Sequence, residues 1–256
     1  MEEADLRPHK SRYWLTSPDK QEDPQAYGQV VQALCSTYLE APALQQQGTH
    51  VISTDEKTGM QATERKYPTL PTRPGLSERI EFEYIRHGTL CLIPSFNVAT
   101  GQIDVATISP TRSEEDFTGH VEATVATDPA ARWIFVSDCL NTHVSESLVR
   151  LVAKHCNITQ DLGEKGKSGI LKSMATRKEF LADRSHAISF QYTPRHCSWL
   201  NQVEIWFGVL SRKLLKRGNF VSLDDLRERV EAFIHYFNAV LAKPYRWTYT
   251  GRPLVA

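Results

Sequence analysis

Apolar residues recur at helical spacing in an early stretch of the chain. After Asp23-Pro24, a pair typical of a helix start, the recurring residues are Tyr27, Val30, Val31, Leu34 and Tyr38. The pattern predicts an amphipathic helix over 24–40. The polar residues 1–23, broken by prolines, read as a linker.

Shorter apolar runs predict strands. Residues 50–55 form a β-rich run that ends at Asp55, and 133–136 are continuously apolar, as in a central strand buried on both faces. That second run leads to Asp138. Further predicted strands cover 82–96 and 102–109, joined as a hairpin by the turn at 97–101, and 187–192.

Helical patterns alternate with these strands. They cover 113–127, 144–155, 198–216 and 222–240. Residues 160–186, which hold three glycines and an excess of Lys and Arg, read as an insertion and not as core. The order of elements predicts an α/β domain with a mixed sheet flanked by helices. We expect the domain to cover 45–256, preceded by a linker and helix over 1–44.

Composition fits an ordinary globular protein. The chain has 256 residues, 41% of them hydrophobic, with no apolar run long enough for a membrane span and no signal-peptide pattern, so we expect a cytoplasmic protein. Its five cysteines form no CxxC pair, which argues against a disulfide framework or a cysteine zinc site. The net charge is zero, but 157–256 hold 16 Lys and Arg against 9 Asp and Glu. This basic part suits a polyanionic partner.

Three acids stand where chemistry is expected. Asp55 and Asp138 follow predicted strands, and Glu204 lies beside the apolar stripe of a predicted helix. Together they would form an all-oxygen site, which selects Mg²⁺ or Mn²⁺. Spacing alone favours plain surface acids, since the chain has 30 Asp and Glu.

The sequence around each acid is more specific. Residues 51–59, 135–143 and 194–207 resemble, in order, the three catalytic blocks of DDE transposases from bacterial insertion sequences of the mariner superfamily, and 242–248 resemble that family's ending. The resemblance implies a ribonuclease H-like fold in which Asp55, Asp138 and Glu204 bind two Mg²⁺ or Mn²⁺ ions. It implies cleavage of transposon ends and transfer of the 3′-hydroxyl strand to target DNA at a TA step. A homodimer bound to DNA, in the bacterial nucleoid, is expected with it.

The chain departs from the family in three ways. Cys139 stands where Asn is common, and the 66 positions from Asp138 to Glu204 exceed the usual gap because of the insertion. No helix-turn-helix module fits before residue 24. This leaves three interpretations: a catalytic fragment, a second reading frame that works with a separate helix-turn-helix chain, or a degenerate copy.

Other candidate residues have competing interpretations. Asn201, one helical turn before Glu204, could support the metal site or simply start the helix, and His143 could touch a phosphate or be structural. A basic flank for DNA phosphates, or an ordinary solvated face, is formed by Arg212, Lys213, Lys216 and Arg217. The six Lys and Arg of 160–186 would extend this track. The rival functions are a DNA-binding remnant that no longer cuts and a repair or recombination nuclease.

Overall fold

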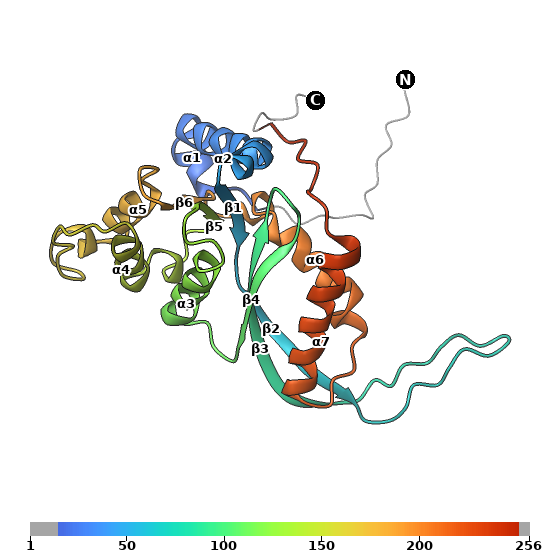
Figure 1. The fold of residues 1–256 in the computed structure, drawn as a ribbon. Coiled ribbons are helices and arrows are strands. Elements are labelled where there is room, and N and C mark those ends of the chain that lie inside the picture. The colour runs from blue at the N-terminus through green and yellow to red at the C-terminus, as the bar shows by residue number, and fades with distance from the viewer. Residues whose placement is uncertain (1–14, 251–256) are drawn as a thin grey trace, which may run out of the picture.

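The centre of the molecule is a six-stranded mixed sheet, seen in the computed structural model, which describes residues 15–250 (Figure 1). The strands follow the order β2-β3-β1-β5-β6. Strand β4 lies outside this order and pairs with residues 91–96 of β3. Strands β1, β5 and β6 are parallel, and the pairs within β1 to β4 are antiparallel. The bounds are β1 Thr49–Thr54, β2 Lys57–Arg65, β3 Tyr84–Asn97, β4 Ile103–Ser109, β5 Arg132–Ser137 and β6 Ile188–Tyr192.

Helices cover both faces of this sheet. In Figure 1, α3, α4 and α5 lie on one side, and α6 and α7 on the other. The helices are α1 Pro18–Glu22, α2 Pro24–Gln46, α3 Glu114–Val125, α4 Glu146–His155, α5 Met174–Ala182, α6 Val203–Lys213 and α7 Leu223–Tyr236. Short helical turns are η1 Thr142–Val144, η2 Ile170–Lys172, η3 Ser198–Leu200, η4 Leu215–Arg217 and the π-helical η5 Phe237–Leu241. The predicted fold class is confirmed.

Two apolar cores lie on opposite faces of the sheet. Side chains alternate along a strand, so Val51 and Val136 enter the core shared with α2, α6 and α7. Their neighbours Ile52 and Phe135 enter the core shared with α3, α4 and α5. All four side chains are fully buried. Burial on both faces explains why β5 is continuously apolar.

Helix starts follow the sequence closely. Asp23 accepts hydrogen bonds from the backbone N–H of Gln25 and Ala26 at the start of α2, and Ser113 caps α3. Helix α2 extends beyond residue 40 to Gln46. Not every residue of its apolar stripe is buried: Val30 is 41% exposed, while its neighbour Val31 is fully buried.

Strand β2 was not predicted from the sequence. Only Met60 and Ala62 are buried along it, so its apolar alternation is too short to stand out. Between β2 and β3 the chain projects from the body as a long arm over 66–83 (Figure 1). Two isolated bridges, Leu70 to Arg79 and Arg73 to Leu76, hold the sides of the arm together.

Two expectations about the second half of the chain are wrong. Residues 160–186 are not all outside the core, because they form η2 and α5 and fully bury Leu171 and Leu181 against the α3 and α4 side. The single helix expected over 198–216 is divided into η3, α6 and η4. Across 15–250, no helix is both long and apolar enough to cross a membrane.

Candidate metal centre

Asp55 and Asp138 lie side by side because their strands are parallel neighbours. Ser53 of β1 is opposite Val136 of β5, and each acid comes two residues further along its own chain. Both therefore leave the carboxyl edge of the sheet at the same level, where α/β folds place their sites. A carboxylate oxygen from each acid and a ring nitrogen of His143 lie within 4.8 Å of one another.

The two carboxyl groups have opposite electrostatic environments. Burial, followed by the negative charge of Asp138, raises the pKa of Asp55 to about 7. Burial also acts to raise the pKa of Asp138, but hydrogen bonding and the positive charge of His143 outweigh it and lower that pKa. Before a metal ion binds, Asp138 is therefore negatively charged near neutral pH, whereas Asp55 is protonated in a substantial fraction of molecules.

His143 bridges two acids and is completely buried. Its Nδ1 lies 2.7 Å from Asp138 Oδ1, and its Nε2 lies 3.0 Å from Glu56 Oε2. Burial alone would lower the pKa of His143, but these two carboxylates raise it to about 10. Because both ring nitrogens are occupied, the imidazole orients Asp138 and has no lone pair left for a metal ion.

Glu204 reaches the same edge from the first turn of α6. Burial, opposed by the positive charge of Lys57 and aided by the negative charge of Asp138, raises the pKa of Glu204. Asp138 is close enough to act electrostatically on Glu204, but Glu204 is not part of the group whose ligand atoms lie within 4.8 Å of one another, which is Asp55, Asp138 and His143. The side chain of Glu204 is exposed, so it remains open to a ligand from solvent.

Asn201 ties α6 to the end of β1. Its amide donates to the backbone oxygen of Thr54 at 3.0 Å and to Asp55 Oδ2 at 3.3 Å. Its side-chain oxygen accepts a hydrogen bond from the Ser53 hydroxyl, which in turn accepts one from the Val203 backbone N–H at 2.8 Å. Asn201 precedes the helix, so it does not share a helical face with Glu204 as the sequence suggested. It supports Asp55 instead.

The donor set fits a hard divalent cation. Three carboxylates supply only oxygen, which Mg²⁺ and Mn²⁺ prefer. Crowding between Asp55 and Asp138 is relieved when a cation lies between them. Sequence reasoning missed Glu56 and Lys57, two charged residues that directly follow Asp55 and act on His143 and Glu204. Their position next to a catalytic candidate was the only signal available.

The four basic residues predicted to bind DNA do not form one flank of a single helix. Arg212 and Lys213 end α6, whereas Lys216 and Arg217 lie in η4. All four are exposed, and within 15–250 none has a carboxylate within 4.0 Å. Their role in DNA binding stays a prediction.

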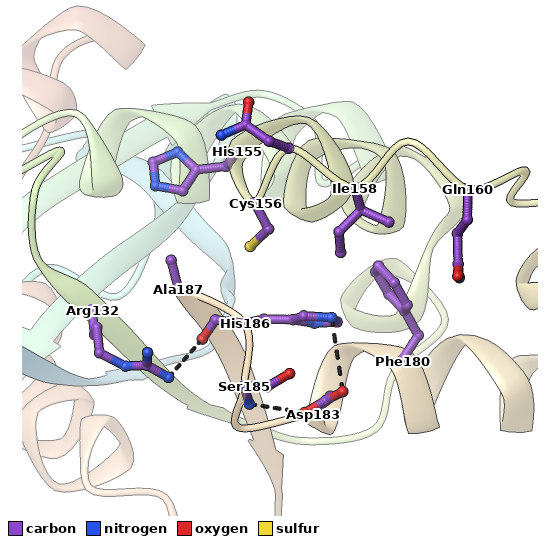
Figure 2. A pocket seen from close by; sticks show the side chains of 11 residues that line it. Arg132, His155, Cys156, Ile158, Gln160, Phe180, Asp183, Ser185, His186 and Ala187 are labelled. Atoms are coloured by element: carbon purple, nitrogen blue, oxygen red, sulfur yellow. Dashed lines mark hydrogen bonds and ion pairs between the residues drawn. The ribbon is translucent and has the colours of Figure 1, made fainter.

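A hollow of about 690 Å³ lies away from the acids (Figure 2). It is lined by Arg132, which begins β5, and by residues just before β6, so it opens at the opposite end of these strands. Within it Arg132 donates to the backbone oxygen of His186 at 3.1 Å, and His186 Nε2 lies 3.9 Å from Asp183. It shares no residue with the acid cluster, so it is not the metal centre.

Comparisons with known proteins agree with this geometry. The family model for DDE superfamily endonucleases matches residues 50–227, which include all three acids. No curated protein sequence matches the chain at a significant level.

Solved structures of Mos1 mariner transposase share the fold. A pre-cleavage Mos1 transpososome gives a TM-score of 0.59 at 11% identity, covering 96% of this chain and 63% of the other. The Mos1 paired-end complex with Mn gives 0.57 at 12% identity, with the same coverage. The Mos1 catalytic domain alone gives 0.52 at 10% identity, covering 91% and 89%. This chain thus spans about 63% of the longer Mos1 chains.

Proposed function

The chain belongs to the DDE superfamily endonucleases, and from that premise we propose that it is the catalytic domain of a mariner-superfamily transposase. It cuts the ends of its own element and joins the freed 3′-hydroxyl to target DNA. One observation carries the proposal: Asp55 and Asp138 meet at the carboxyl ends of parallel strands, and Glu204 on the first turn of α6 is near enough for Asp138 to act on its pKa. The fold shared with Mos1 complexes supports it.

Asp55, Asp138 and Glu204 are the proposed ligands of divalent metal, with two ions in the complete site. Bound metal would activate the attacking oxygen and stabilise the oxygen that leaves phosphorus. The chain's own residues hold the acids in place. Asn201 fixes one oxygen of Asp55, and His143 fixes one oxygen of Asp138. The other oxygen of Asp138 has no hydrogen bond from the described residues, whereas the other oxygen of Asp55 accepts one from the Glu56 backbone N–H at 2.8 Å.

The two proposed steps are displacements at phosphorus. In the first, a water oxygen attacks, the bond to the 3′-oxygen breaks, and a 3′-hydroxyl and a 5′-phosphate result. In the second, that 3′-hydroxyl attacks a target phosphate and releases a target 3′-hydroxyl. Neither step needs an oxidant or reductant, so one set of acids serves both.

Several finer points belong to the proposal. The three motif blocks support an origin in a bacterial insertion sequence, and a TA target follows from the same resemblance, since TA steps deform easily. We propose a homodimer on DNA, with end recognition supplied by a helix-turn-helix unit that can be a separate chain. Residues 45–256 as the catalytic unit, with 1–44 leading into it, are likewise proposed limits.

The test is a cleavage and strand-transfer assay with Mg²⁺ or Mn²⁺. The substrate is the genomic DNA that flanks the gene on both sides, and products are mapped at nucleotide resolution. Asp55→Asn, Asp138→Asn and Glu204→Gln should each lower cleavage by roughly 10²–10³-fold or more, because each removes a charge from the metal site without a change in volume. Glu115→Gln, an exposed acid on α3, is the matched control.

The outcomes separate the rival functions. Cuts at the element's ends with joined products support a transposase. Metal-dependent cuts without joining indicate a nuclease of another kind, and DNA binding without any cutting indicates an inactive remnant. Near-normal activity in any one of the three variants would show that the proposed ligand set is wrong.

A further inference from the structure

The inserted segment between Asp138 and Glu204 is fixed to the catalytic edge. Leu181 of α5 is fully buried in the core that holds β5 and β6. Arg177, also on α5, donates from Nε to the backbone oxygen of Val144 at 2.7 Å and from Nη1 to that of Leu171 at 3.2 Å. Val144 directly follows His143, so α5 is attached to the turn that orients Asp138.

Lys178 is the next residue, and it emerges at the end of β6. Its Nζ lies 5.5 Å from the ring centroid of Tyr192, the last residue of β6. Tyr192 is opposite Ser137 in the parallel pair of β6 with β5, and Asp138 comes next. The charge of Lys178 also acts on the thiol of Cys139, the residue after Asp138. The ring contact with Tyr192 therefore places Lys178 near the carboxyl ends of β5 and β6.

Among the described residues, Lys178 forms no close ion pair, although it lines a hollow that also holds Asp19, Glu22 and Asp23. In the part of the chain that the structure describes, no carboxylate lies within 4.0 Å of its Nζ, whereas Lys165 pairs with Glu114 and Lys167 with Glu164. Asp19 is near enough to feel the charge of Lys178, but Arg195 binds both of its oxygens. The side chain of Lys178 is exposed to solvent.

Lys57 provides a second cation on the far side of the acids. It starts β2 and acts electrostatically on Glu204, while Lys178 lies by Tyr192 at the end of β6, beyond β5 in the strand order. A polyanion crossing the three acids would therefore meet a positive charge before and after them. Lysine is a common point-charge partner of phosphate groups.

We propose that Lys178 binds a backbone phosphate of the DNA strand lying across the catalytic edge, so that the inserted helix α5 is part of the DNA-binding surface. The inference rests on the proposed function for the identity of the polyanion. The insertion thereby brings one cation to the β6 side of Asp138. Such a contact positions the strand and reads no base.

The test is the salt dependence of binding to a short duplex of arbitrary sequence, without divalent metal. Lys178→Met keeps the aliphatic stem over Tyr192 and removes the charge. It should lower the slope of log affinity against log salt by about 1 and weaken binding roughly 3- to 10-fold at 0.1 M salt. Lys178→Arg should keep the slope, and Lys154→Met, an exposed residue of α4 outside the inserted segment, should leave both quantities unchanged.

Equal slopes for Lys178→Met and Lys154→Met would overturn the proposal, and so would a loss of slope in Lys178→Arg equal to that in Lys178→Met. Thermal unfolding checks that each variant is folded, which the exposed position of Lys178 favours. Binding is measured without cleavage, so the result is independent of the cleavage assay. A chain that binds through Lys178 but never cuts would refute the proposed function alone.

Discussion

The carboxyl group of Asp55 couples metal binding to pH. Its pKa is raised to about 7, by burial first and by Asp138 second, and a metal ion must displace the proton. Apparent metal affinity should therefore be constant above pH 7 and fall up to about tenfold per pH unit below it.

The measurement is the Mn²⁺ concentration that gives half of the full rise in melting temperature, between pH 5.5 and 8.5. Bound metal raises the melting temperature by mass action. Asp55→Asn should lose this pH dependence along with most of the affinity. A wild-type affinity that does not change between pH 5.5 and 7 would contradict the role of Asp55 as a ligand.

His143 predicts a separate window of pH-dependent stability. Its pKa in the folded chain is raised to about 10, from an ordinary value near 6.5. Its stabilising contribution to the free energy of unfolding is therefore complete below about pH 6.5 and is lost as pH rises towards 10. His143→Asn should remove that part of the stability, which denaturant unfolding at several pH values measures. Asp55 changes the stability in a lower pH range, between about pH 4 and 7, so the effects of the two residues can be separated.

His120 is the matched control for this experiment. It is also buried, but it hydrogen-bonds the hydroxyls of Ser95 and Thr107, and burial lowers its pKa to about 3. His120→Gln should shift stability by a constant amount between pH 6.5 and 10. If both variants changed the pH dependence of stability equally, the contacts of His143 with Glu56 and Asp138 would not be the cause of that dependence.

How far the site was predictable depends on where each partner lies in the sequence. Asp55, Asp138 and Glu204 were chosen from local motifs. The structure brings Asp55 and Asp138 together, while the role of Glu204 stays a prediction. Glu56 was not chosen, because its role depends on His143, 87 positions away. Short-range patterns carry no information about such a pair.

Helices and strands were predicted wherever their burial repeats over several turns or residues. Strand β5 and helix α3 follow that rule, while β2 and α5 do not, since each buries too few residues to leave a pattern. The break after Lys213 was missed because apolar residues Leu214 and Leu215 continue the helical spacing through it. Tertiary packing, and not local propensity, decides these elements.

Helix α5 can be tested as a part of the core. Leu181→Ala should lower the free energy of unfolding by about 2–5 kcal/mol, because it leaves a cavity beneath the inserted segment. Urea unfolding measures the change. Phe82→Ala, on the projecting arm and 89% exposed, should change it by less than about 0.5 kcal/mol. A small effect at Leu181 would mean that α5 can detach while the sheet stays folded.

Charge across the molecule predicts how it holds DNA. Arg212 lies about 12 Å along α6 from Glu204, at 1.5 Å per residue, and Lys216 and Arg217 follow in η4. Changing Arg212, Lys213, Lys216 and Arg217 together to Ala should reduce the slope of log affinity against log salt by about 3–4. Filter binding or anisotropy at several salt concentrations provides the measurement. Tight, salt-insensitive and sequence-specific binding by this chain alone would contradict a backbone-only surface.

The hydrogen bond between Ser53 and Asn201 has a consequence for the timing of activity. It joins residues 148 positions apart, and it ties the strand that ends before Asp55 to the segment that starts the helix of Glu204. Contacts so distant in sequence form only after both parts of the chain exist. During translation, a nascent chain with Asp55 and Asp138 outside the ribosome still has no complete site. The proposed DNA-cutting activity can therefore arise only after α6 has been synthesised and has folded against the sheet.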